Sequence, residues 1–151
     1  MNRFVNIAGA VLAAVGIWLT GGVAAQDSDL HGRVSFADES ALIRGSDDTD
    51  WSFAALNSIV LPGDTLWADD DSALEVEFSG GTFLRLADGS RLEVRDVPPN
   101  GLFRADLGSF FVQRISRSNG DVVFDSPVGS VTIEPDTQVR IDKTEIAESV
   151  K

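Results

Sequence analysis

The stretch LPGDTLWADDDSALEVEFSGGTFLRLADGS, residues 61–90, predicts short β-strands separated by tight turns. Its Pro-Gly-Asp turn precedes an expected strand over 65–68. Beyond an acidic corner, apolar and charged residues alternate over 73–78 and again over 82–86, which is the period of a half-buried strand. Asp-Gly at 88–89 is a strong hairpin signal. This pattern indicates a binding or scaffold module and contains no obvious catalytic motif.

The same alternation of strand and turn continues on both sides of this stretch. Further strands are expected over 31–37, 91–95, 102–107, 110–115, 122–124, 129–133 and 139–141. A turn at Gly108 is predicted to separate two of them. Residues 51–61 are ambiguous, because Ala-Ala-Leu is compatible with one helical turn while 59–61 resembles a buried strand.

The fold class that follows is all-β, a single small domain that is either a β-sandwich or a short β-solenoid-like roll. No helix-length apolar pattern follows residue 26, which excludes a βαβ fold. The expected inward residues are Leu74, Val76, Phe78, Leu84, Leu86, Leu92, Val94, Val131, Ile133, Val139 and Ile141. Val34 and Phe36 are expected to share one face of the first strand. On the outward face, Glu75 and Glu77 are expected to meet Arg85, Arg91, Glu93 and Arg95 as cross-strand charge pairs.

Residues 1–25 have the composition of a secretory signal peptide, which we expect to be helical. Arg3 is followed by an apolar run over 4–19 and by small residues before an expected cleavage at Gln26. An uncleaved membrane anchor is the alternative, because the run approaches the ~20 residues that a membrane helix needs. The chain then divides into the signal, a flexible segment 26–31, an all-β domain 32–142 and a charged tail 143–151. We expect a periplasmic or secreted protein.

The chain is acidic, with a net charge of −12 and no cysteine. A negative field repels phosphate, so nucleic acid and anionic membrane surfaces are disfavoured as partners. Contact with a membrane is expected only if the N-terminal segment stays uncleaved. Without disulfides, the domain depends on its core, in which each buried Leu, Val or Phe contributes about 1.5–3 kcal/mol.

The sequence contains few residues of the types that catalyse reactions or hold a cofactor. There is no cysteine, the one histidine is His31, and no Gly-x-Ser-x-Gly motif occurs. A glycosidase needs a carboxyl group in an apolar pocket, whereas the acidic residues here cluster in turns. Calcium is a minor alternative at 47–50 or 69–71, although neither run has the spacing of an EF-hand loop. We therefore expect no enzyme activity, no cofactor and no metal site.

An ordered set of motifs resembles the FecR-type extracytoplasmic domain. The motifs are Gly-Asp-x-Leu at 63–66, Ser-x-Leu-Glu-Val at 72–76, Gly-Gly-Thr-x-Leu-Arg-Leu at 80–86 and Asp-Gly-Ser at 88–90. Downstream, GLFRADLGSFFV at 101–112 resembles the family's leucine-glycine-strand element. VVFDSPVGSVTI at 122–133 resembles its strand-Thr-Pro-strand element, with Ser-Pro in place of Thr-Pro. The resemblance spans about residues 32–142.

The resemblance implies a sensing or docking module. Similar domains occur in transmembrane regulators that carry signals from an outer-membrane receptor to an alternative sigma factor. In those regulators a cytoplasmic sigma-binding segment precedes the membrane helix, whereas three residues precede the apolar run here. The anti-sigma function is therefore not carried over. We expect a non-enzymatic module of the cell envelope that binds an envelope protein.

The candidate partner-binding residues are Trp51, Trp67, Asp69, Asp70 and Asp71. Aromatic side chains anchor partner proteins or stack on sugars, and they also fill the end of a β-core. Trp67 lies in an expected strand, which favours packing, while Trp51 follows an acidic loop and fits either role. A free sheet edge is a further expected contact surface. The alternative function is carbohydrate or cell-wall binding through exposed tryptophans.

Overall fold

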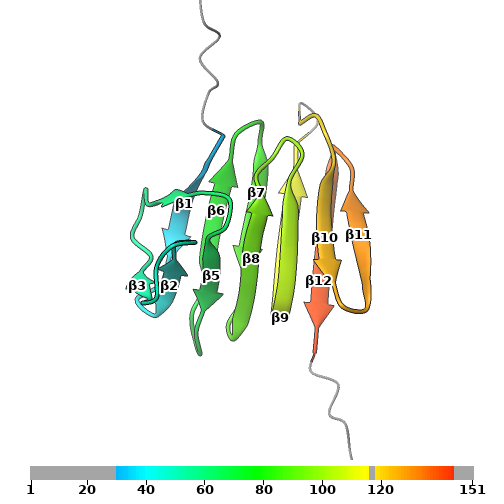
Figure 1. The fold of residues 1–151 in the computed structure, drawn as a ribbon. Helices are drawn as coiled ribbons and strands as arrows, with labels where there is room; N and C mark the ends of the chain where they lie inside the picture. Colours follow the sequence, from blue (N-terminus) through cyan, green and yellow to red (C-terminus); the bar gives the residue numbers. More distant parts are fainter. Residues whose placement is uncertain (1–29, 116–117, 145–151) are drawn as a thin grey trace, which may run out of the picture.

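The computed structural model describes residues 30–115 and 118–144, so the signal segment and most of the charged tail lie outside the described residues. Within these ranges the chain is all-β and contains no helix. Its strands are β1 (Gly32–Ala37), β2 (Ala41–Arg44), β3 (Ser52–Phe53), β4 (Ile59–Val60), β5 (Thr65–Ala68), β6 (Leu74–Phe78), β7 (Thr82–Leu86), β8 (Ser90–Asp96), β9 (Leu102–Arg114), β10 (Val122–Ser126), β11 (Gly129–Ile133) and β12 (Thr137–Lys143). Together they form one 12-stranded sheet (Figure 1).

This sheet curls into two halves that face each other. The first half-sheet has the order β4-β1-β6-β7-β9-β12, and the second has the order β3-β2-β5-β8-β9-β10-β11. Neighbouring strands are antiparallel except for β9 and β10, which are parallel. The coils of a solenoid stack in parallel, so the antiparallel pairing decides between the two expected forms in favour of a sandwich-like curled sheet.

Strand β9 belongs to both half-sheets and corrects the predicted turn at Gly108. Its first part pairs with β8 and its last part with β7, along one uninterrupted strand of 13 residues. Gly108 has a φ of +112°, a conformation that glycine adopts readily. A Cβ atom there would lie 2.5 Å from the Cα of Ser90, so glycine also permits the close approach of β8. The glycine therefore marks a bend within one strand.

The hydrophobic core lies between the half-sheets. The ring of Phe103 lies 5.4 Å from that of Phe78 and 5.3 Å from that of Phe124, measured between centroids, which joins the two layers. The expected inward residues Leu74, Val76, Phe78, Leu84, Leu86, Leu92, Val94 and Ile133 are buried. Val139 and Ile141 are partly buried and pack against this core. The predicted alternation is confirmed at these positions.

Phe36 and Val131, both expected in the core, are exposed. A β-bulge between Val34 and Phe36 shifts the register against β6, so that Val34 is buried and Phe36 is 46% exposed. Val131 is also 46% exposed. It lies on β11, outside β10, where the first half-sheet has already ended at β12 (Figure 1). The alternation of apolar and polar residues within one strand predicts neither the bulge nor the place where the opposite half-sheet ends.

The ambiguous segment 51–61 contains the short strands β3 and β4 and no helical turn. Val60 is buried, whereas Ile59 and Leu61 are exposed, so the predicted buried strand is confirmed at one position only. Strands β2 and β3 were not predicted, because they are short and lack a clear alternation. Among residues 30–115 and 118–144, no helix has the length and apolar character needed to cross a membrane.

Candidate functional site

The two tryptophans named from the sequence lie together on the outer surface of the second half-sheet. Leu66 of β5 is buried in the core, so its neighbour Trp67 points to the opposite side. Trp51 immediately precedes β3, and its ring centroid lies 5.4 Å from that of Trp67. The planes meet at 65°, an edge-to-face arrangement that aromatic rings favour. Both side chains are half-buried, so each contributes to packing and also to the surface.

A pocket of about 490 Å³ opens beside this tryptophan pair. Besides the indoles, its walls include Arg44, Asp48, Arg91, Glu93 and Asp106. The guanidinium carbon of Arg44 lies 4.8 Å from the centre of the Trp51 ring, within the range of a cation–π contact. Arg91 Nε forms an ion pair with Asp106 Oδ2 at 3.1 Å. The pocket therefore combines aromatic surface with hydrogen-bond donors and acceptors of both charges.

The Gly63–Asp64 turn borders this pocket through Gly63 and is hydrogen-bonded to β8. Gly63 lines the pocket, and its backbone N–H donates to the carbonyl of Val94 at 2.6 Å. In return, Val94 N–H donates to the Asp64 carbonyl at 2.8 Å. The Asp64 carboxylate accepts the Leu61 N–H at 2.8 Å, and burial raises the pKa of this carboxyl above its ordinary value. The turn predicted from Pro-Gly-Asp thus positions the strand that carries Trp67.

The acidic turn at Asp69, Asp70 and Asp71 lies after β5 and does not line the pocket. Its backbone is tightly turned, since the Asp69 carbonyl accepts N–H bonds from Ser72 at 3.1 Å and from Gly89 at 3.4 Å. In the described part of the chain, no three His, Asp or Glu side chains are grouped so that they could hold a metal ion. The structure therefore brings the tryptophans together and leaves the acidic turn apart from them.

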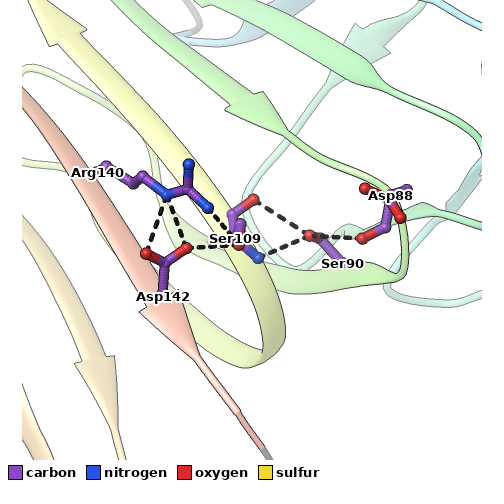
Figure 2. A network of polar contacts seen from close by, with 5 residues as sticks. All are labelled: Asp88, Ser90, Ser109, Arg140 and Asp142. Carbon is purple, nitrogen blue, oxygen red and sulfur yellow. Dashed lines mark hydrogen bonds and ion pairs between the residues drawn. The ribbon is translucent and has the colours of Figure 1, made fainter.

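A second polar cluster lies where β9 passes between the half-sheets. Figure 2 shows Ser90 on β8, Ser109 on β9, and Arg140 and Asp142 on β12, with Asp88 in the turn before β8. Ser90 Oγ accepts the Ser109 N–H at 2.9 Å and donates to the Ser109 carbonyl at 3.1 Å. Ser109 Oγ donates to Asp142 Oδ1 at 2.5 Å, and Arg140 Nε donates to the same oxygen at 2.8 Å. These two hydrogen bonds lower the pKa of Asp142, and the bond from Ser109 makes the larger contribution.

This second cluster has the character of a structural link. A carboxylate with a lowered pKa is a weak base, and a guanidinium stays protonated, so neither partner activates the Ser109 hydroxyl as a nucleophile. The hydrogen bonds instead join three strands at the point where β9 bends. The tryptophan pocket is therefore the stronger candidate for recognition.

The sequence predicted Arg91 and Glu93 on the outward face beside Glu75 and Glu77, but Glu75 pairs with Arg85 at 2.6 Å and the other two line the tryptophan pocket. Sequence reasoning missed the remaining charged residues of this pocket, which are Arg44, Asp48 and Asp106. Arg91 is the direct cross-strand neighbour of Trp67. Arg44, Thr65 and Glu93 form the adjacent row across three strands. A period-two pattern places Thr65, Arg91 and Glu93 on the outward face, whereas Arg44 lies on a strand without clear alternation. The pairing of β2 with β5 and of β5 with β8 is needed to bring them together. Comparisons with protein-family models, with curated proteins and with solved structures found no match.

Proposed function

We propose that this chain is a non-enzymatic, FecR-like sensing and protein-interaction module of the bacterial cell envelope. The observation that supports it is a row of apolar and aromatic side chains on the outer face of the second half-sheet. In this row Phe53 pairs with Leu42, and Leu42 pairs with Trp67. Phe53 is 74% exposed, and Trp51 extends the surface beside Trp67. Aromatic residues of this kind are enriched among the residues that dominate binding energy at protein interfaces.

The charges around this row fit the same proposal. Arg44, Asp48, Arg91 and Asp106 surround the tryptophans and would form the polar rim of an aromatic contact. The net charge of −12 favours a partner with a basic surface, because opposite potentials accelerate encounter and suppress wrong partners. The resemblance to FecR-type domains and the expected signal peptide support the proposal that the partner belongs to the cell envelope. They are also the ground on which we propose a part in signalling to gene regulation.

A pull-down from envelope extract tests this function. Protein produced from the full chain is compared with Trp51→Ala and with Phe83→Ala, a half-buried aromatic residue on the outer face of the first half-sheet. Circular dichroism and urea unfolding first establish that both variants are folded. We expect one or more envelope proteins to be retained by the wild type and by Phe83→Ala and lost with Trp51→Ala. No retention by the wild type, or equal retention by all three, would contradict the proposal.

Carbohydrate or cell-wall binding is the second candidate, and the composition of the pocket is what favours it. Two indoles lie beside carboxylates and guanidinium groups in a volume of about 490 Å³, which suits a sugar with many hydroxyls. Against it, Arg44 already covers one face of Trp51. Titration with soluble peptidoglycan fragments separates the candidates, because a change in tryptophan fluorescence with glycan and no retained envelope protein would favour carbohydrate binding.

A further inference from the structure

The two half-sheets end unequally at β11 and β12. Within the described residues, β11 pairs with β10 alone and β12 pairs with β9 alone. Since β10 and β12 both flank β9, the second half-sheet extends one strand further than the first (Figure 1). Among the described residues, each of these outer strands has one edge whose backbone N–H and C=O groups have no strand beside them. In that part of the chain, the first half-sheet thus lacks the strand that would lie opposite β11.

An apolar cleft of about 270 Å³ lies at this place. Its walls include Phe124, Val128 and Val131 from the β10–β11 hairpin and Ile141 from β12. Val131 is the cross-strand partner of Phe124, so it faces the same side as the core. It is nevertheless 46% exposed, and Val128 is 76% exposed. The inner surface of the second half-sheet therefore continues beyond β12 with nothing covering it in the described part of the chain.

We propose that the free edge of β12 binds an extended segment of a basic partner protein as an additional strand. This inference rests on the proposed docking function and specifies how the partner is held. Backbone hydrogen bonds to β12 would provide affinity, as in other cases of strand addition. Every second side chain of the added strand would point into the cleft and cover Val128 and Val131, so small or medium apolar residues fit these positions.

The charges along β12 favour a basic segment. Asp125 lines the cleft, and Glu134 and Asp136 lie in the turn at the opposite end of β12, which an added strand of the same length would also pass. Among the described residues, none of these three carboxylates forms an ion pair. Of the two cations on β12, Arg140 is neutralised by Asp142 at 2.8 Å. Lys143, whose Nζ donates to the neutral Ala105 carbonyl at 2.8 Å, keeps its charge and offsets one of the three carboxylates. Basic side chains of the added strand would neutralise the remaining excess.

The same charge disfavours a second copy of this chain at the edge. Pairing of β12 with β12 of another copy would bring together two molecules that each have a net charge of −12. It would also place the two sets of cleft carboxylates close to one another. Like charges across an interface suppress association, so the structure favours a partner of opposite charge.

Synthetic peptides provide the probe. The first is a capped peptide as long as β12, 7 residues, in which Val and Lys alternate. A second peptide has Glu in place of Lys. Two further peptides carry N-methyl groups at alternate residues, so that each has one edge blocked for hydrogen bonding. We expect the Val-Lys peptide to bind, the Val-Glu peptide to fail, and one N-methylated peptide to bind while the other does not.

Binding is measured by calorimetry and by amide hydrogen exchange on the full chain. Strand addition slows the exchange of those β12 amides that point toward its free edge. A purely electrostatic contact would not produce this result. If the Val-Glu peptide binds equally well, or if both N-methylated peptides bind, the proposal is overturned. Protection of the same amides in the free protein would show that a segment of this chain occupies the edge. Protection that rises with protein concentration would show a second copy, and either result also overturns the proposal.

Val131→Lys and Ile59→Lys form a matched pair of variants. Both replace an exposed β-branched residue on a strand, with 46% and 50% of the side chain exposed, so neither change should unfold the protein. Val131→Lys places a charge in the cleft and should weaken the Val-Lys peptide about tenfold or more, because it removes apolar contact and puts an ammonium group against the valine side chains. Ile59→Lys on β4, at the far edge of the first half-sheet, should leave binding unchanged. Equal affinity of both variants would contradict the assignment to the cleft.

The pull-down separates this inference from the function on which it rests. An envelope protein that is lost with Trp51→Ala but kept with Val131→Lys would support the docking function and overturn the β12 site. An envelope protein lost with Val131→Lys and kept with Ile59→Lys would support both. If the Val-Lys peptide binds with protection of β12 while no envelope protein is retained, the edge is confirmed and the docking function is contradicted.

Discussion

Replacement of Gly108 by alanine should destabilise the fold far more than replacement of Gly89 by alanine. Both glycines have a positive φ, +112° and +64°. A Cβ at Gly89 would meet no atom within 4 Å, whereas at Gly108 it would lie 2.2 Å from the Oγ and 2.5 Å from the Cα of Ser90. Both positions therefore carry a conformational penalty, which is at least as large at +112° as in the left-handed region at +64°, and Gly108 alone adds a steric one.

The magnitudes follow from this difference. A left-handed conformation costs an L-residue about 1–2 kcal/mol, and this is the expected loss of unfolding free energy for Gly89→Ala. Gly108→Ala adds the cost of overpacking, about 1–3 kcal/mol, because a backbone atom of β8 must move. It would also displace Ser90 from its hydrogen bonds to Ser109. The sum is a large part of the ~5–15 kcal/mol that stabilises a typical domain.

Urea unfolding measures both effects. Tryptophan fluorescence reports on the second half-sheet, where Trp51 and Trp67 lie, and linear extrapolation gives the free energy of unfolding in water. Equal destabilisation by the two variants would refute the reasoning, because it would mean that β8 and β9 do not approach closely at Gly108. Gly108 would then be an ordinary turn between two strands, as the sequence suggested.

Three other expected outcomes test the core, the polar cluster and the tryptophan pair. Phe103→Ala should lower the free energy of unfolding by about 3–5 kcal/mol, since it removes the buried ring that joins both half-sheets. Phe53→Ala, at a 74% exposed position, should change it by less than about 0.5 kcal/mol. Urea unfolding of both variants measures this difference. Because the folded pKa of Asp142 is lowered from 3.8, its contribution to stability is present above that value and is lost as the pH falls through the folded pKa. The stability difference between wild type and Asp142→Asn, measured in urea, should therefore shrink in acid; a constant difference would contradict the pKa shift. The indoles of Trp51 and Trp67, 5.4 Å apart, should give a paired positive and negative band in far-ultraviolet circular dichroism, and substitution of either by phenylalanine should remove both lobes together.

The sequence by itself determined the class of the fold and most of the core. Alternation with a period of two is a local property of a strand, so it placed Leu74, Val76 and Phe78 inside before any partner strand was known. Turn residues such as Pro62-Gly63-Asp64 act through their own backbone preferences, and that turn is where the sequence predicts it. It also singled out Trp51 and Trp67, although it did not predict that their rings touch.

Only the tertiary structure decided the pairing of distant strands, and with it the sites. The tryptophan pocket needs Arg44 of β2 and Arg91 of β8 on either side of β5, and these neighbours are set by long-range pairing that local patterns do not encode. The course of β9 through Gly108 depends on contact with β8. Exposure of Val131 depends on where the opposite half-sheet ends. The residues of a strand themselves determine which of its sides is buried, whereas the packing of the whole chain determines which element covers that side.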